Sequence, residues 1–566
     1  MTYVLGIHDG HNCGAALCKG GKVVAAVCEE RLTRNKNEVG FPTKSIQEVL
    51  RIEGISGTDI DDCVFASWFM HEPEHLKNIE PWYRVGSAEQ ERAEARPEGY
   101  KTALLKYTQE NRMAQAVELL GISRDRVSFV EHHKAHLAAA YYTSPYSHDT
   151  VLGITCDGAG DGVSATVSIC SGNSIERIAT TDRNSSLGKL YSRMTFLLGM
   201  QPWQDEYKVM GLAPYADRHK ALGASVSLRR LLGIDGMRFS RNTFLSINYC
   251  YEYLERECRN TRFDTLAGAI QFFTEDMLVE LVRNAIRETG IHDIVCGGGT
   301  FMNVKANMHI ANMPEVHSMY VMPSAADESL AIGACLDKWY SKYGYGKPDC
   351  TSILSDLYLG GGFTDEDVEE ATVTAFISSH TDKQFVYTKY SDITNHVAAV
   401  LRDGHIVARC AGRMEWGARA LGNRSILAPA NDRGIVEKLN RTIKCRDFWM
   451  PFAPTIIDDV AEYLFADPKD LHPHFMTYAF ETREQNLHRV TAAVHPYDHT
   501  MRPQVITKDA NPEYYDIVDK AGGVVLNTSF NLHGYPIVYT PEDAIEVFLN
   551  SGLEFLALGN YLLTKT

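Results

Sequence analysis

A strand-and-turn pattern that occurs twice constrains the fold of this chain more than any other feature. Residues 3–7, 14–18 and 23–27 are apolar and are separated by turn residues, which predicts three strands. The same arrangement returns at residues 151–156, 165–170 and 175–179. The fragments LGIHDG and LGITCDG align, and each places an acid just past an apolar strand. The repeat predicts an internal duplication, with two α/β lobes facing a cleft.

Two further strand units follow the second copy. Residues 293–296 predict a strand that leads into the glycines 297–299 and then into a helix around residues 302–309. Residues 319–323 predict another strand, which is followed by a helix over residues 330–339. Turns at the carboxyl ends of strands are where α/β sheets bind ligands. We therefore expect ligand-binding residues in these turns.

The pattern changes after residue 345, where glycines 360–362 and a polar stretch predict a domain boundary. Beyond it, apolar residues from Ile393 to Leu401 share one helical face, and residues 405–410 predict a strand. These signals predict an α/β chain with one domain over residues 1–350, a linker region over residues 351–385 and a second domain over residues 386–566.

The charge distribution excludes broad binding to anionic polymers or surfaces. The 566 residues carry a net charge of −16, while residues 402–446 alone carry +6, so the remainder carries −22. A basic island in an acidic chain is typical of a local phosphate site, so we expect no nucleic-acid and no membrane partner. The thirteen cysteines are scattered and the opening residues lack a charged leader, which predicts reduced thiols and a cytoplasmic protein.

Two histidines one helical turn apart indicate a metal site. His132 and His136 are four residues apart at the start of a helical run, so both imidazoles leave the same face. Asp157 and Asp327 each follow an apolar strand and could complete the ligand set. The alternatives are ordinary packed histidines and aspartates that cap turns.

Three other groups of residues are candidates for phosphate or acyl chemistry. The glycines at 158–162 and 297–299 could let backbone N–H groups approach phosphate oxygens, and His11 lies in the first turn. Residues 412–425 alternate cations with glycines, as forked arginine contacts to phosphate require. Residues 527–531 offer hydroxyl and amide groups at a strand end. The alternatives are a solvated basic face and ordinary polar turns.

These stretches, in their order along the chain, resemble the O-carbamoyltransferase family that includes the nodulation-factor, cephem and tobramycin carbamoylating enzymes. The resemblance runs nearly from end to end. The matching stretches are residues 11–17, 29–34, HHKAHLAAAYY at 132–142, EYKVMGLAPYA at 206–216, GGGTFMNVKAN at 297–307, PSAADESLAIGA at 323–334, GRMEWGARALGNRSILA at 412–428, IKCRDFWMPFAP at 443–454, RPQ at 502–504 and LNTSFNLHGYPIV at 526–538.

The resemblance implies a fold and a reaction. The first domain would have a duplicated actin-like ATPase fold, similar to the tRNA threonylcarbamoyl-transfer protein, and the second a YrdC-like α/β fold. In the family, the YrdC-like domain makes carbamoyladenylate from carbamoyl phosphate and ATP with Mg²⁺. The first domain then transfers the carbamoyl group to a hydroxyl of a small molecule, such as an antibiotic precursor or a sugar-containing metabolite. A homodimer is the assembly that we consider.

The resemblance also assigns roles to residues. His11 matches the family's general base, and Fe²⁺ is the ion usually held by the family's metal ligands. The matching metal ligands are His132, His136, Asp157 and Asp327. The residues that match the nucleotide cleft of the transfer domain are Lys208, Gly297, Gly298 and Asn303. The residues that match the carbamoyl phosphate and ATP site are Arg413, Arg419, Arg424, Ser425, Lys444, Arg446, Arg502, Asn527, Ser529 and Asn531.

Three positions depart from the family pattern. Asn12 stands where the family commonly has Asp, Met450 stands where an Arg often precedes Pro-Phe-Ala-Pro, and Tyr535 replaces a usual Glu. These departures put the contacts of those three positions in question. Two rival functions remain: a tRNA threonylcarbamoyl-type modification enzyme, which the charge of −22 outside the basic island disfavours, and a degenerate nucleotide-binding regulatory module. The acceptor cannot be identified from the sequence.

Overall fold

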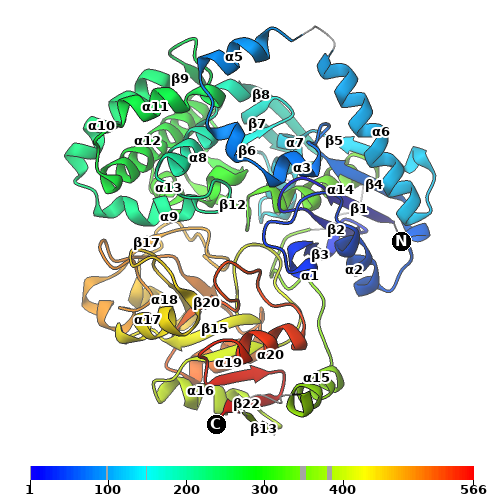
Figure 1. Ribbon diagram of the computed structural model, residues 1–566, viewed down its shortest axis with the longest axis vertical. Helices are drawn as coiled ribbons and strands as arrows, with labels where there is room; N and C mark the ends of the chain where they lie inside the picture. Colours follow the sequence, from blue (N-terminus) through cyan, green and yellow to red (C-terminus); the bar gives the residue numbers. More distant parts are fainter. Residues whose placement is uncertain (1, 97–99, 148, 345–351, 379–384) are drawn as a thin grey trace. The chain divides into compact units, whose positions relative to one another are not determined.

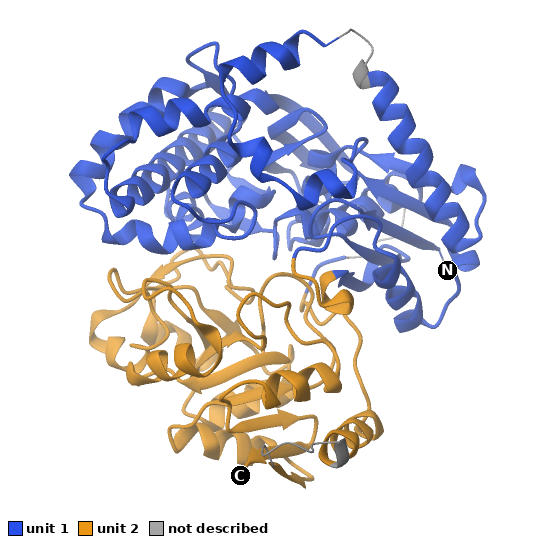
Figure 2. Cartoon of the chain, in the orientation of Figure 1, with its two compact units in different colours: residues 1–29, 37–354 blue, residues 30–36, 355–566 orange. Residues whose placement is uncertain are grey.

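The computed structural model describes residues 2–96, 100–147, 149–344, 352–378 and 385–566. These residues form two compact units, coloured separately in Figure 2. Unit 1 comprises Met1–Glu29 and Asn37–Leu354, and unit 2 comprises Glu30–Lys36 and Ser355–Thr566. The short segment Glu30–Lys36, which includes helix α1 (Glu30–Thr33), therefore belongs to the second unit although it lies early in the sequence.

Unit 1 is built on two five-stranded sheets with the same topology. The first sheet has the order β3-β2-β1-β4-β5, in which β1, β2 and β3 are antiparallel neighbours while β4 and β5 run parallel to β1. Its strands are β1 (Tyr3–His8), β2 (Gly14–Lys19), β3 (Lys22–Cys28), β4 (Asp62–Ala66) and β5 (Val127–Val130).

The second sheet has the order β12-β11-β6-β7-β8, with β6, β7 and β8 antiparallel and β11 and β12 parallel to β6. Its strands are β6 (Val151–Gly160), β7 (Val163–Ser171), β8 (Ser174–Asp182), β11 (Asp293–Gly297) and β12 (Ser318–Val321). Strand for strand, this repeats the first sheet. The predicted duplication is therefore confirmed, and the N-terminal part has the expected actin-like arrangement (Figure 1).

Thirteen helices surround these sheets among the described residues of unit 1, together with a small hairpin of β9 (Leu232–Asp235) and β10 (Arg238–Arg241). The helices are α2 (Thr43–Glu53), α3 (Pro73–Lys77), α4 (Glu80–Tyr83), α5 (Ser87–Glu94), α6 (Tyr100–Leu120), α7 (His132–Thr143), α8 (Leu187–Leu197), α9 (Glu206–Leu212), α10 (Arg218–Leu231), α11 (Tyr251–Glu257), α12 (Phe263–Thr289), α13 (Val304–Ala311) and α14 (Leu330–Lys342).

Close packing at two glycines fixes helix α14 against the first sheet and helix α7. A Cβ atom at Gly6 would lie 1.9 Å from the carbonyl oxygen of Ala331, and one at Gly333 would lie 1.8 Å from that of Ala135. Such distances are far below van der Waals contact, so only glycine allows these backbones to meet. The contact places the start of α14, and the short turn Asp327–Ser329 that precedes it, beside the histidines of α7.

Unit 2 contains one mixed eight-stranded sheet with the order β13-β22-β21-β14-β15-β20-β16-β19. Its strands are β13 (Phe385–Lys389), β14 (Val407–Cys410), β15 (Arg424–Pro429), β16 (Ala453–Ile457), β19 (Gln504–Ile506), β20 (Val524–Ser529), β21 (Phe555–Leu558) and β22 (Tyr561–Lys565). A two-stranded ribbon of β17 (Phe480–Glu481) and β18 (Thr500–Met501) lies outside this sheet. This unit is α/β as expected, and its likeness to the YrdC fold stays a prediction.

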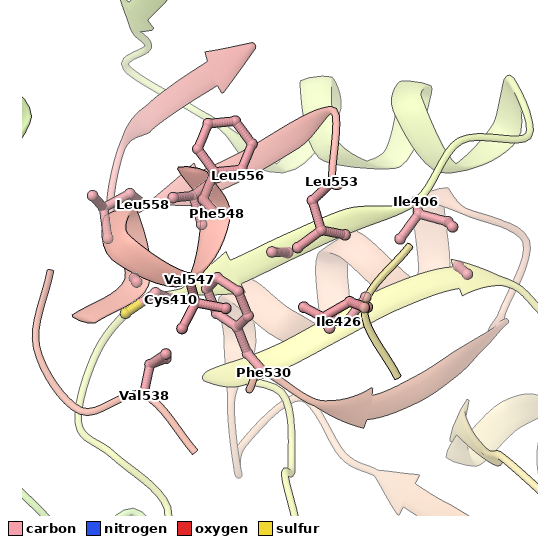
Figure 3. Close-up of a cluster of buried hydrophobic side chains, with 14 of the residues drawn as sticks. Ile406, Cys410, Ile426, Phe530, Val538, Val547, Phe548, Leu553, Leu556 and Leu558 are labelled. Carbon is pink, nitrogen blue, oxygen red and sulfur yellow. The ribbon is translucent and has the colours of Figure 1, made fainter. Parts of the chain in front are cut away.

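Each face of this sheet buries its own apolar cluster. Ile426 belongs to one cluster, drawn in Figure 3 with Phe530, Val547 and Leu556, while its neighbour Leu427 belongs to the other. This alternation is the period of two that a strand with two covered faces requires. The helices of the unit are α1, α15 (Asp365–Ser378), α16 (Thr394–Arg402), α17 (Gly434–Leu439), α18 (Asp458–Leu464), α19 (Pro512–Lys520) and α20 (Pro541–Leu549).

The predicted linker region over residues 351–385 is wrong for most of its length. Residue 351 and residues 379–384 lie outside the described residues, but residues 365–378 form helix α15. Val368 and Ala371 are buried in the unit 2 core, and Ala375 packs against it. Their spacing of three and then four residues is helical, and the acidic residues between them hid this apolar stripe from the sequence analysis.

Two expectations concern the whole chain. Among the described residues, no helix is long and apolar enough to cross a membrane. Every described cysteine is a free thiol, and eleven of these twelve are buried.

Candidate metal centre and anion site

Two histidines and two aspartates of unit 1 converge on one buried point. Nε2 of His132 lies 3.2 Å from Nε2 of His136 and 3.3 Å from Oδ2 of Asp157, and Nε2 of His136 lies 3.5 Å from Oδ1 of Asp327. One ligand atom from each of the four residues falls within 4.8 Å of the others. The structure thus brings together all four residues that the sequence analysis singled out as metal ligands.

The local sequence explains how α7 presents its histidines to this point. Glu131 caps the helix by accepting a hydrogen bond from the N–H of Lys134 at 2.8 Å. A Cβ atom at Gly160 would lie 2.0 Å from the His132 ring, and one at Gly297 would lie 2.7 Å from the carbonyl oxygen of His136. These glycines therefore make room for α7, which gives Gly297 a packing role besides the expected nucleotide contact.

Serine hydroxyls fix the orientation of both histidines. Oγ of Ser67 lies 2.9 Å from Nδ1 of His132, and Oγ of Ser329 lies 3.1 Å from Nδ1 of His136. With Nδ1 engaged in each ring, Nε2 is the nitrogen that faces the carboxylates. Metal-binding histidines are commonly held through the second ring nitrogen in this way. The sequence analysis missed both serines, because Ser67 is far from the histidines in sequence.

The donor set fits a divalent first-row metal ion. Burial and the nearby Asp327 carboxylate act to raise the pKa of Asp157, but its hydrogen bond with His132 and the charges of both histidines lower that pKa below its ordinary value. Two ionised carboxylates in one buried place repel each other unless a cation neutralises them. Imidazole nitrogens and carboxylate oxygens, without thiolates, suit iron, manganese or zinc.

His11 lies beside this cluster. Its Nδ1 is 3.4 Å from Oδ2 of Asp327, while Oδ1 of the same carboxylate faces His136. The carboxylate thus orients His11, a task that the sequence analysis could not assign because Asn12 replaces the family's Asp. Asn12 instead occupies a left-handed conformation with φ 53°, which Asn tolerates better than most residues.

A second histidine, His8, also faces Asp327 and was missed by the sequence analysis. Its Nε2 lies 2.9 Å from the carbonyl oxygen of His11 and 3.7 Å from Oδ2 of Asp327. Burial lowers the pKa of His8 to about 4, although the Asp327 charge opposes that shift. A neutral His8 at physiological pH can hold the main chain of the turn that carries His11. Its position at the end of β1, in the repeated fragment, was the available signal.

Arg112 ties the first turn to the end of strand β4. Its Nε and Nη2 donate to the two oxygens of Asp9, each at 2.7 Å, and its Nη1 donates to the carbonyl oxygen of Ser67 at 2.9 Å. Both charged side chains are only 6% exposed. Asp161 completes this frame, because it accepts hydrogen bonds from the N–H groups of His132 at 2.9 Å and Phe69 at 3.0 Å.

The residues expected in a nucleotide cleft of unit 1 have partners within the unit. Lys208 lies 3.2 Å from Asp205, and Oδ1 of Asn303 accepts the N–H of Ala306, capping α13, and also a hydrogen bond from Gln271. Gly298 has φ 95°, and a Cβ atom there would lie 2.4 Å from the carbonyl oxygen of Cys156. These contacts give each residue a structural role, and their role in nucleotide binding stays a prediction.

In unit 2, cations gather near the ends of strands β15, β16 and β20. Burial lowers the pKa of Arg502 well below its ordinary range, and the charges of Arg419 and Arg446 add to this shift. No ion pair joins Arg502 to a carboxylate within the part of the chain that the structure describes. A half-buried group of like charges favours an anion as its partner.

Lys444 lies at the end of a π-helical turn, Asn440–Lys444, and is 2% exposed. Its Nζ donates to Oδ1 of Asn531 at 2.8 Å, to Oγ of Ser529 at 3.2 Å and to the carbonyl oxygen of Ser529. Burial lowers the pKa of Lys444 well below its ordinary value, with the Arg446 charge adding to the effect. The structure thus brings together three residues that the sequence analysis assigned to one site.

Four other predicted residues of this unit are engaged in the fold itself. Arg424 is fully buried and donates to the carbonyl oxygens of Ala411 at 2.7 Å and Tyr539 at 3.1 Å. Arg413 likewise donates to the carbonyl oxygens of Gly360 and Leu359. Ser425 accepts the N–H of Gly422 at 2.9 Å, and the amide nitrogen of Asn527 donates to the carbonyl oxygen of Ala420 at 3.1 Å.

Comparison with known families decides the identity of the chain. The pattern described as "Carbamoyltransferase N-terminus" matches residues 3–336, and that described as "Carbamoyltransferase C-terminus" matches residues 398–565. The chain belongs to the carbamoyltransferase family. The predicted enzyme class, a carbamoyltransferase, is thereby confirmed, while the acceptor and the use of ATP are questions that the family alone does not answer.

Relatives of this carbamoyltransferase extend over its whole length. An uncharacterized protein of Methanocaldococcus jannaschii is 30% identical over 99% of this chain and 99% of its own length. The nodulation protein NolNO of Sinorhizobium fredii is 30% identical over 99% of this chain and 79% of its own length. Among solved structures, component A of the Acidaminococcus fermentans (R)-2-hydroxyglutaryl-CoA dehydratase is 15% identical over 60% of this chain and all of that chain, with a TM-score of 0.34.

Proposed function

We propose that this carbamoyltransferase activates carbamoyl phosphate with ATP to form carbamoyladenylate and then transfers the carbamoyl group to a hydroxyl of a small molecule. The observation that carries the proposal is the presence of two chemically different sites in two units. Unit 1 holds the His132, His136, Asp157 and Asp327 cluster, and unit 2 holds a group of cations that has no carboxylate paired with Arg502 among the described residues.

The first step belongs to unit 2. Carbamoyl phosphate and ATP are both polyanions, and Arg419, Arg446 and Arg502 supply the positive charge that would hold their phosphates. Ser529 and Asn531 orient the amine of Lys444 through hydrogen bonds. Mg²⁺ would accompany ATP. Water would cleave carbamoyl phosphate to carbamate and inorganic phosphate, a carbamate oxygen would then attack the α-phosphorus of ATP, and pyrophosphate would leave. Arg424 and Arg413 donate hydrogen bonds to main-chain carbonyls. We therefore propose that these two arginines stabilise the loop that carries Arg419.

The second step belongs to unit 1. His11 is placed to accept the proton of the acceptor hydroxyl as the oxygen attacks the carbamoyl carbon, and AMP leaves. The Asp327 oxygen 3.4 Å from Nδ1 of His11 orients the ring. A divalent ion, for which we propose Fe²⁺, would neutralise the charge on the leaving phosphate as a Lewis acid. Two histidines and two aspartates would hold that ion.

The acidic charge of the chain favours this function over tRNA modification. Outside residues 402–446 the chain carries −22, and a polyanion such as tRNA would be repelled by such a surface. The departures at Met450 and Tyr535 do not remove the cations of unit 2: Met450 is 9% exposed, and Tyr535 is 56% exposed and offers its carbonyl oxygen to Asn531.

The test uses the full chain loaded with Fe²⁺, and it measures two products. Pyrophosphate release should require both carbamoyl phosphate and ATP, and it should occur without an acceptor. With a panel of hydroxylated metabolites, an accepted compound should gain about 43 Da, the mass of one carbamoyl group replacing a hydrogen, together with stoichiometric AMP. Carbamoyl transfer without ATP, or pyrophosphate release without carbamoyl phosphate, would contradict the proposal.

A further inference from the structure

The arm, residues Glu30–Lys36, folds with unit 2, although the residues on either side of it belong to unit 1 (Figure 2). Both ends of the arm are held by one residue of unit 1. The carbonyl oxygen of Cys13 accepts the N–H of Glu29 at 2.9 Å, and the N–H of Cys13 donates to the carbonyl oxygen of Glu38 at 3.2 Å. The arm is therefore a short loop with two fixed ends, which limits the movement of its side chains.

Arg31 of the arm reaches the loop that carries Arg419. The Arg31 side chain is 6% exposed, and its Nη2 donates to the carbonyl oxygen of Gly417 at 2.8 Å. The same loop is held from within by Glu415, whose Oε1 accepts the N–H of Leu421 at 2.8 Å. Arg31 and Glu415 thus hold the backbone just before and just after Arg419.

Arg34 of the arm holds a second loop, which joins β20 to α20. Its Nη1 donates to the carbonyl oxygen of Ile537 at 2.6 Å, and its Nη2 donates to that of Pro536 at 3.2 Å. Nε of Arg34 also lies 3.5 Å from Oδ1 of Asp543, in the first turn of α20. The backbone of Arg34 has φ 63°, in the left-handed region that non-glycine residues rarely adopt. Strain that the surroundings hold in place in this way is often found at functional sites.

The loop held by Arg34 also orients the amine of Lys444. The carbonyl oxygen of Tyr535 accepts the side-chain amide of Asn531 at 2.7 Å, and Oδ1 of Asn531 accepts a hydrogen bond from Nζ of Lys444 at 2.8 Å. Tyr535 directly precedes Pro536, whose carbonyl group accepts from Arg34. A displacement of this loop would therefore move the hydrogen-bond partner of a buried cation.

We propose that Arg31 and Arg34 are positioning residues for the anion site of unit 2, because they fix the two loops that set the places of Arg419 and Asn531. Each arginine acts through a residue of the site and does not itself contact phosphate. A guanidinium group suits this task, since its planar set of donors can hold two acceptors in a fixed geometry. This inference rests on the proposed function of unit 2 and adds two residues from the N-terminal part of the chain to it.

Arg31→Ala and Arg34→Ala test the proposal in the full chain. Each should raise the KM for carbamoyl phosphate or for ATP about 10-fold or more in acceptor-free pyrophosphate release, because a misplaced cation binds phosphate weakly. Arg34→Lys keeps the charge but not the planar donors, so it should restore only part of the affinity. Arg402→Ala is the matched control, because Arg402 is exposed and also donates to a main-chain carbonyl of unit 2, that of Lys520.

Double-mutant cycles separate positioning from a general loss of stability. If Arg31 acts through Arg419, Arg31→Ala should have little further effect on KM in protein that already carries Arg419→Ala. Arg34→Ala should likewise have little further effect beside Asn531→Ala. The Arg34 side chain is 28% exposed against 6% for Arg31, so its cycle decides the question if Arg31→Ala does not fold. Additive effects in the cycles, or unchanged KM values for both substrates, would overturn the proposal.

Ligand binding distinguishes a failure of this inference from a failure of the proposed function. Carbamoyl phosphate and, with Mg²⁺, α,β-methylene-ATP are titrated calorimetrically into the wild type and the variants. Both arginine variants should bind at least one of these ligands about 10-fold more weakly than the wild type and Arg402→Ala. If the wild type binds the ligands but releases no pyrophosphate, the proposed function is wrong, and the affinities still decide the role of the arginines. Wild-type affinities in both variants would contradict that role, and no binding by the wild type would overturn both proposals.

Discussion

Asp327 contacts His136 and His11 through different carboxylate oxygens, Oδ1 at 3.5 Å from His136 Nε2 and Oδ2 at 3.4 Å from His11 Nδ1. One side chain thus joins the candidate metal centre to the candidate base. The arrangement depends on the start of α14, which the contact between Gly333 and Ala135 holds against α7. Metal binding and the orientation of His11 should therefore be lost together.

Asp327→Asn tests this link. The amide keeps the shape of the side chain but removes the negative charge, so metal affinity should fall at least about 10-fold and carbamoyl transfer should fall with it. Pyrophosphate release by unit 2 should continue. Metal content is measured by elemental analysis and affinity by chelator competition. The control is Asp276→Asn, an exposed pairing partner of Arg229, and normal metal affinity in Asp327→Asn would contradict the link.

Ser67→Ala tests the support of His132. Removing the hydroxyl that lies 2.9 Å from Nδ1 should weaken metal affinity about 10- to 100-fold, the usual cost of losing such an outer contact. Ser45→Ala is a matched control, because Ser45 is also buried and its hydroxyl has no hydrogen-bond partner within the described residues. Equal metal affinities in the two variants would show that Ser67 does not orient the ligand.

More of the fold than of the candidate site could be predicted from the sequence. The repeated fragments that begin at Leu5 and Leu152 predicted the duplication, because continuous apolar runs separated by turn residues can be recognised directly in the sequence. Helix α15 was missed because its apolar stripe of Val368, Ala371 and Ala375 is short and set among acidic residues. The sequence therefore predicted a domain boundary at residues where helix α15 packs against the core of unit 2.

Site residues could be predicted only where they lie in a motif. His132 and His136 share a helix, so their spacing revealed them. Ser67, Ser329 and Arg112 act through three-dimensional contacts with residues far away in sequence, and no pattern of spacing records such contacts. The converse also holds, since Arg424 looked like a phosphate ligand in a basic motif but lies buried among main-chain carbonyls.

The buried Glu206 predicts a pH dependence of stability. Burial raises the pKa of Glu206 above its ordinary value, so the folded protein holds this proton more tightly than the unfolded chain. The contribution of Glu206 is then fully present below the unfolded pKa and is lost as pH rises through the folded pKa. Glu206→Gln cannot ionise and can still accept the Trp203 N–H. Its melting temperature should therefore fall less than that of the wild type as pH rises from about 4.5, and parallel melting curves would contradict this.

Arg502→Ala tests the anion site of unit 2. If this half-buried cation holds phosphate as proposed, removing it should slow carbamoyl-phosphate-dependent pyrophosphate release about 30- to 1000-fold. Arg433, an exposed residue of the basic island of unit 2, supplies the control variant Arg433→Ala, which should keep the wild-type rate. Metal content should be normal in both. Similar rates in the two variants would show that positive charge in general, rather than this position, supports the reaction.

If two sites in two units perform the two half-reactions, substitutions at His11 and Lys444 should separate them. Acceptor-free pyrophosphate release and acceptor carbamoylation are measured in metal-loaded His11→Ala and Lys444→Ala, with circular dichroism and thermal melts to verify folding. We predict that Lys444→Ala loses both signals, whereas His11→Ala keeps pyrophosphate release and loses only the carbamoylated product. If folded His11→Ala lost pyrophosphate release as completely as Lys444→Ala, the assignment of the two half-reactions to separate sites would be wrong.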